Sequence, residues 1–158
     1  MTDLALLLTR SAATLLVGIF AGGVFFTVLA PSLADMPGPA YVRYWQSLNH
    51  DYARAMPILL LTSIACTLAA TVLALRRGPV AIGFTAAALV LIVASVVLTV
   101  TRMEPLNELA NGWDPDRLPA DWADRRSEWL RLHGVRSAMA VTAFIGLITV
   151  QALDPIAR

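Results

Sequence analysis

The stretch PVAIGFTAAALVLIVASVVLTVT, residues Pro79–Thr101, decides the fold of this chain. Its 23 residues include no charged side chain. A helix of about 20 apolar residues crosses the roughly 30 Å hydrocarbon core of a membrane. Inside that core there is no water to bond the backbone, so a single segment must satisfy its own peptide groups as a helix. The stretch therefore predicts a transmembrane helix.

Three further windows have the same character. Residues 11–30, 55–75 and 134–153 are 20, 21 and 20 residues long, and Arg136 is the one charged side chain among them. Over all 158 residues, 58% are hydrophobic and 15% are charged, whereas soluble domains average about 25% charge. We therefore expect an all-α fold, a four-transmembrane-helix bundle in one domain over residues 1–158. A disordered chain, a nucleic-acid binder and an ordinary soluble enzyme are excluded.

The segments outside these windows differ strongly between the two ends of the predicted bundle. Both termini and the turn Arg76–Pro79 share one end, here called the hairpin face. Residues 31–54 and 102–133 form the other end, the cap face, with 16 of the 23 charges, all four Trp, all three Tyr and both His. An interfacial aromatic belt occurs at both membrane surfaces. The asymmetry favours a structured, Trp-rich helical cap, with a simple belt as the alternative.

The composition predicts an integral, multi-pass protein of the cell membrane. Arg76 and Arg77 in a short loop favour cytoplasmic termini, although the cap face carries many arginines too, so the orientation stays open. The first apolar run is too long for a signal peptide, and we expect it in the mature protein. Arg10 is expected to snorkel to the nearby membrane surface. The single cysteine, Cys66, excludes a thiol oxidase built on paired cysteines.

Local patterns predict how the cap is built. Tyr41, Trp45, Leu48 and Tyr52 recur every three or four residues, which indicates an amphipathic helix running into the second membrane helix. Pro105 is expected to end or redirect the third membrane helix at Glu104. Turn residues occupy 111–115, and the helical signal returns from Asp121.

Arg136 is the most distinctive single residue, because it lies about one turn inside the fourth apolar run. An ionisable group at that depth usually faces the bundle interior beside a partner. Glu104, Glu128 and Asn107 are possible partners, and snorkelling to the interface is the alternative. His133 precedes Arg136 by three residues, on the same helix face, and is an acid–base candidate because an ordinary imidazole titrates near neutral pH.

Three other polar residues of the cap carry weaker signals. His50 is a second acid–base candidate. Asn49 and Asn107 lie near the membrane boundary, where an amide can donate to a developing oxyanion or simply cap a helix or turn. The two histidines could also hold a metal or haem, but no metal-ligand spacing supports this.

Taken together, these features resemble the anthrone-oxygenase-like group of small four-helix membrane proteins. The resemblance lies in the order and spacing of short motifs along nearly the whole chain. These are Ala21–Phe26 leading to Pro31, Trp45 with Asn49, Pro105-Leu106-Asn107, and Trp129-x-x-x-His133-x-x-Arg136.

The resemblance implies oxidation of an anthrone to an anthraquinone with O2, without an organic cofactor. A general base would form an enolate, and neutral or cationic donors would stabilise it. The implied catalytic residues are His133 as base, Arg136, Asn107 and Asn49 around the oxyanion, and His50 as a second base candidate. The implied substrate-binding residues are Trp129, Trp45, Trp122 and Tyr52.

The expected partners are a hydrophobic aromatic small molecule or a lipid, the membrane itself and, through its small-residue stretches, a second copy of the chain. A non-catalytic accessory or binding protein and a His-ligated metal or haem protein remain alternatives. A proton-coupled exporter fits less well, since none of the four windows contains an Asp or Glu.

Overall fold

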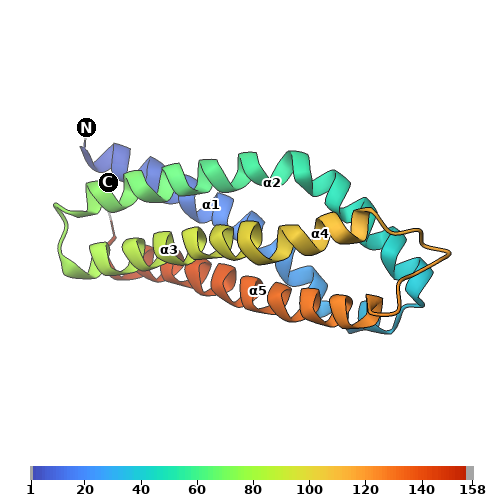
Figure 1. Cartoon of the computed structure of the whole chain (residues 1–158). Helices are drawn as coiled ribbons and strands as arrows, with labels where there is room; N and C mark the ends of the chain where they lie inside the picture. The colour runs from blue at the N-terminus through green and yellow to red at the C-terminus, as the bar shows by residue number, and fades with distance from the viewer. Residues whose placement is uncertain (1, 156–158) are drawn as a thin grey trace.

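The computed structural model describes residues 2–155, and these residues form helices, turns and loops without a strand. This agrees with the predicted all-α fold (Figure 1). The elements in chain order are α1 (Thr2–Leu29), the 3-10 turn η1 (Pro31–Asp35), α2 (Gly38–Ala74), α3 (Pro79–Leu98), the π-helical turn η2 (Thr99–Met103), α4 (Glu104–Asn111) and α5 (Trp122–Leu153).

The long helices form a four-membered bundle. Helices α1 and α3 each pack against both α2 and α5, and Figure 1 shows α4 continuing the line of α3. Four helical stretches are long and apolar enough to cross a membrane, namely Asp3–Leu29, Gly38–Ala74, Pro79–Asn111 and Trp122–Leu153. Each contains one of the predicted windows apart from a residue or so at its end, which is as expected for a multi-pass membrane protein.

Small side chains occupy the contacts between helices. Ala13, Ala88 and Ala143 are fully buried, and the buried hydroxyls of Thr67 and Thr85 donate to the carbonyls one turn earlier at 2.7 and 2.8 Å. Many leucine, valine and isoleucine side chains are instead exposed on the outer surface. Helices in lipid associate in this way, because small residues let the backbones approach closely while apolar side chains face the acyl chains.

The hairpin between α2 and α3 follows the expected glycine and proline chemistry. Gly78 has φ of +125°, a left-handed conformation that is costly for other residues. Pro79 then begins α3, where its missing N–H is not needed.

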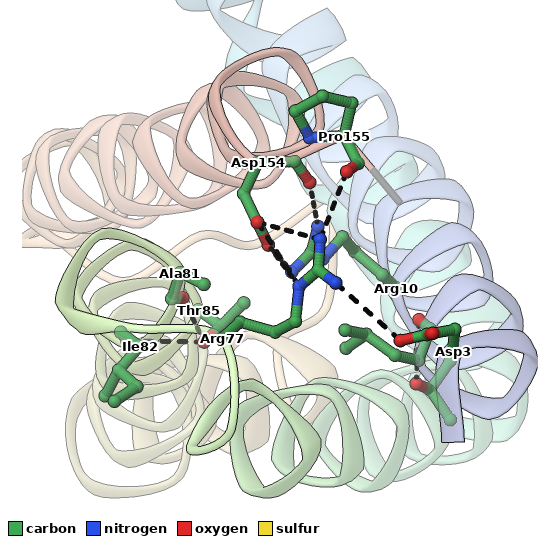
Figure 2. A network of polar contacts seen from close by, with 10 residues as sticks. Asp3, Arg10, Arg77, Ala81, Ile82, Thr85, Asp154 and Pro155 are labelled. Carbon is green, nitrogen blue, oxygen red and sulfur yellow. Dashed lines mark hydrogen bonds and ion pairs between the residues drawn. The ribbon is translucent and has the colours of Figure 1, made fainter. Parts of the chain in front are cut away.

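Arg10 does not snorkel to solvent, so that expectation is wrong. Its side chain is 2% exposed, and its Nη2 lies 3.0 Å from Oδ2 of Asp154. Arg77 of the hairpin binds Oδ1 of the same carboxylate at 3.1 Å (Figure 2). The bundle brings the end of α5 against α1 and the hairpin, so the carboxylate of Asp154 there is the partner of the buried guanidinium.

The expectation that Pro105 ends or redirects the third membrane helix is also wrong. The helical path continues to Asn111, and the turn just before Pro105 is π-helical. Proline lacks an N–H and clashes with the carbonyl four residues earlier. A π turn, in which the Glu104 N–H donates to the Thr99 carbonyl, loosens the helix where that clash would fall.

The cap face holds the predicted Trp-rich cluster. Tyr41, Trp45, Met103 and Trp129 are buried together there. The ring centroids of Trp45 and Trp129 are 5.3 Å apart. Helix α2 runs unbroken from the cap into the bundle, so the same helix contributes to this aromatic cluster and to the membrane-spanning part.

Candidate functional site

A cleft of about 380 Å³ opens at the cap end of the bundle, between α2, the α3–η2–α4 rod and α5. Its polar lining residues are Asn49, Tyr52, Thr99, Glu104 and Arg136, and its apolar ones are Ala53, Met56, Pro57, Leu60, Leu61, Val96 and Val100. The cleft has the size and mostly apolar wall of a small-molecule site. Its polar groups on α2 and α4 lie toward the cap, whereas the apolar residues continue toward the middle of the bundle.

A second hollow of about 530 Å³ adjoins the cleft on the cap face. It is lined by Gln46, Asn49, His50, Ala53, Arg54, Glu104 and Asn111. Asn49, Ala53 and Glu104 belong to both spaces. A carboxylate and an amide thus stand where an apolar cleft meets a polar, open one.

His133 lies behind the cleft and is 1% exposed. Its Nε2 is 2.8 Å from the Val24 carbonyl oxygen, which can only accept, so Nε2 carries the proton. Its Nδ1 is then the acceptor for Nη2 of Arg136, at 2.8 Å. Both ring nitrogens are occupied, and the imidazole links α1 to the arginine.

Arg136 is the cationic group of the cleft. His133 holds one of its terminal nitrogens, while its buried Nε has no hydrogen-bond partner within residues 2–155. Glu104 lines the same cleft, yet no ion pair joins the two within the described part of the chain. The guanidinium is therefore positioned by a neutral ring and keeps donors for an anionic ligand.

Asn107 joins the Trp cluster to the cleft. Its Oδ1 accepts hydrogen bonds from the indole N–H of Trp45 and of Trp129, each at 3.0 Å. Its Nδ2 donates to Oε2 of Glu104, also at 3.0 Å. The two buried indoles fix the amide, and the amide fixes one oxygen of the carboxylate.

The predicted site residues fall into three groups. Asn49, Tyr52 and Arg136 line the cleft, and His50 lines the adjoining hollow. His133, Asn107, Trp45 and Trp129 form the layer behind these, connected through the hydrogen bonds above. Trp122 lies elsewhere, packed on Gly38 and under the guanidinium of Arg126. Their chemical roles stay predictions.

The sequence pattern did not predict that Glu104 lines the cleft. It indicated Glu104 only as a possible partner of Arg136. It is the first acid after the longest apolar run, and it stands three residues before Asn107. That i, i+3 spacing places two polar side chains on one helix face. Pro105 concealed this relation, because a helix that ended at Glu104 would not continue to Asn107.

The arrangement combines apolar walls with a proton acceptor and hydrogen-bond donors. The Glu104 carboxylate is the acceptor, and Arg136 with Asn49 and Tyr52 offers donors. Within residues 2–155, no three His, Cys, Asp or Glu side chains converge as metal ligands.

Comparison with known proteins identifies the family. The sequence model described as anthrone oxygenase matches residues 45–146, which is more than half of the chain. That range includes every residue that lines the cleft. No curated protein and no solved structure is significantly similar to the chain. On the strength of the family match, the chain belongs to the anthrone oxygenase family.

Proposed function

We propose that the protein oxidises a hydrophobic aromatic ketone of the anthrone type with O2, inside the cleft of α2, η2 and α5. Family membership supports an oxygenase-like function. The observation that carries the finer proposal is the cleft itself, where apolar walls and the side chains of Glu104 and Arg136 face one space. The four helices that are long and apolar enough to cross a membrane support a site in or beside the bilayer, where such a substrate partitions.

The reaction needs no organic cofactor and no metal in this proposal. A base breaks a C–H bond beside the aromatic rings, and the electron pair stays on the substrate as a delocalised enolate. The enolate transfers an electron to O2, and recombination forms a C–O bond and then a hydroperoxide. Loss of the second C–H proton and cleavage of the O–O bond give the quinone and one water, so each anthrone consumes one O2.

In this proposal the main contribution of the protein is to stabilise the negative charge of the enolate. Donors that are already oriented toward a developing negative charge lower the barrier without rearranging. Arg136 is oriented by His133 at 2.8 Å and brings a full positive charge. Asn49 and Tyr52 line the same end of the cleft and offer neutral donors, although one N–H of the Asn49 amide already donates to Oδ1 of Asn111 at 3.1 Å.

His133, which the family resemblance implied as the base, has a different role in this proposal, which is to position Arg136. Its unprotonated nitrogen already accepts from Arg136, and its other nitrogen donates to Val24. Removing a substrate proton with this ring would require Arg136 to leave it. Its described contacts favour a role in holding the guanidinium.

The test is an oxygen-uptake assay with the full chain in detergent or lipid nanodiscs. We expect anthrone-dependent O2 consumption and formation of one anthraquinone per O2, above the autoxidation seen in empty nanodiscs. Treatment with a strong chelator should leave the rate unchanged. A protein that binds anthrone but does not accelerate its oxidation would contradict the proposal and support the non-catalytic alternative.

A further inference from the structure

We propose that Glu104 is the general base, and that it passes the substrate proton to water in the polar hollow of the cap face. This inference rests on the proposed function and assigns its first chemical step to one carboxylate. The proton moves from a substrate carbon to a carboxylate oxygen, and the C–H electron pair remains on the substrate as the enolate. The proton then leaves Glu104 for water, which restores the base.

The location of Glu104 is the first support. It is the one carboxylate among the residues that line the cleft, and it also lines the adjoining hollow. One side of it therefore faces apolar walls where a hydrophobic substrate fits. The other side faces His50 and Arg54 in an open, polar space, so the carboxylate can exchange protons without the substrate leaving.

The second support is the way the carboxylate is held. Oε2 accepts from Asn107 at 3.0 Å, and Asn107 is itself fixed by the indoles of Trp45 and Trp129. Within residues 2–155, Oε1 has no hydrogen-bond donor. A base needs this combination, since one oxygen sets the direction of the group while the other keeps its lone pairs for the proton.

The backbone supplies the third support. Glu104 directly follows the π turn η2, which inserts an extra residue into the helix just before Pro105. An α-helix turns by 100° per residue, so the insertion rotates every following side chain around the helix axis. Turns of this kind recur at functional sites, and here the rotated residues are those that present Glu104 to the cleft and Asn107 to the two tryptophans.

A proton-exchange experiment isolates this step from the chemistry of oxygen. Wild-type protein and anthrone are mixed without O2 in D2O, and loss of the reactive C–H signal is followed by NMR. Wild type should accelerate exchange over empty nanodiscs. Glu104→Gln keeps the shape and an acceptor for Asn107 but should slow exchange and aerobic turnover by about 100-fold or more, the usual contribution of a general base.

Glu108→Gln is the matched control, because Glu108 is an exposed carboxylate one turn further along α4 and lines neither space. It should exchange and turn over like wild type. Glu104→Asp, which keeps a shortened carboxylate, should recover part of the exchange rate. That recovery would show that the acid, and not merely the fold around it, is required.

The outcomes separate this inference from the proposed function. If wild type neither exchanges nor oxidises anthrone, the proposed function fails. If wild type is active and Glu104→Gln exchanges within a few-fold of it, Glu104 is not the base. Loss of exchange in His133→Gln, with exchange retained in Glu104→Gln, would assign the base to the histidine and overturn the inference.

Discussion

The cap face has ion pairs of its own, such as Arg43–Asp116 and Arg125–Asp121, but the charged groups that line its cleft differ from those at the hairpin face. On the hairpin face, Arg10 and Arg77 both bind the carboxylate of Asp154, so the charges satisfy one another (Figure 2). On the cap face, Arg136 and Glu104 are held by neutral partners, an imidazole and an amide, and face a shared cleft. Mutually paired charges stabilise a fold, whereas charges held by neutral groups keep their capacity to act on a ligand.

The largest effect should come from removing the cleft cation. Arg136→Gln is expected to lower kcat/KM for anthrone oxidation by about 100-fold to 1,000-fold, because the enolate loses an oriented donor. Arg131→Gln, an exposed arginine less than two turns away on α5, is the control and should be active. Steady-state oxygen uptake measures both variants. Equal rates for Arg136→Gln and wild type would remove the distinction between the two ends.

Stability should respond at the opposite end. Asp154→Ala leaves the buried guanidinium of Arg10 without its ion-pair partner, and such a loss costs about 3 kcal/mol of unfolding free energy. Turnover of the folded variant should match wild type. The exposed Asp3, whose contact with Arg77 is a long 3.7 Å, supplies the control Asp3→Asn, with little change. Reversible denaturation in detergent measures the difference, and an unchanged midpoint for Asp154→Ala would contradict the expected structural role.

The pH dependence of that stabilisation follows from the same contacts. Burial alone would raise the pKa of Asp154, but hydrogen bonds and charge from Arg77 and Arg10 outweigh it and hold the pKa below its usual value. Because the native pKa is lower than that of the unfolded chain, about 3.9, the stabilisation is complete above that value. It is lost as the pH falls through the native pKa.

We therefore expect the stability difference between wild type and Asp154→Ala to be nearly constant from pH 7 to about pH 5 and to shrink below about pH 4. Denaturation curves of both proteins at several pH values provide the measurement. A difference that grows on acidification would mean that Asp154 is destabilising when ionised.

The smallest effect should come from the mouth of the cleft. Val100 lines it and is 64% exposed, so Val100→Trp should obstruct substrate entry and raise KM about tenfold, the equivalent of roughly 1.4 kcal/mol. Val97→Trp, three residues earlier on the outer surface, lines no part of this cleft and serves as control. Similar KM values for the two variants would place substrate binding elsewhere.

Much of the architecture could be predicted because it depends on one quantity, the run length of apolar residues. Apart from Ala30, the windows at 11–30 and 134–153 fall within long helices, and the aromatic stripe of Tyr41 and Trp45 forms part of a buried cluster at one end. The two wrong predictions concern residues whose behaviour depends on contacts or backbone geometry that a local pattern does not contain. Arg10 found a carboxylate 144 residues away, and Pro105 was accommodated by a π turn.

The candidate site was predicted in part for the same reason. Arg136 and His133 lie one turn apart on one helix, and a spacing rule finds such pairs. The ordering of Asn107 between two indoles and Glu104 combines residues from α2, α4 and α5. The periodicity of one helix cannot predict a contact that joins residues of three different helices.

By itself, the sequence determined that this chain is a four-helix protein for an apolar environment and that its polar chemistry is concentrated at one end. The transfer of apolar side chains out of water and the hydrogen bonding of the backbone both act over stretches of about 20 residues. The composition of such a stretch is therefore enough to predict a helix of this kind. Only the tertiary structure decided which polar groups pair with one another and which face the cleft. That choice depends on hydrogen bonds of about 3 Å between residues distant in sequence, and the packing of α2, α4 and α5 sets those distances.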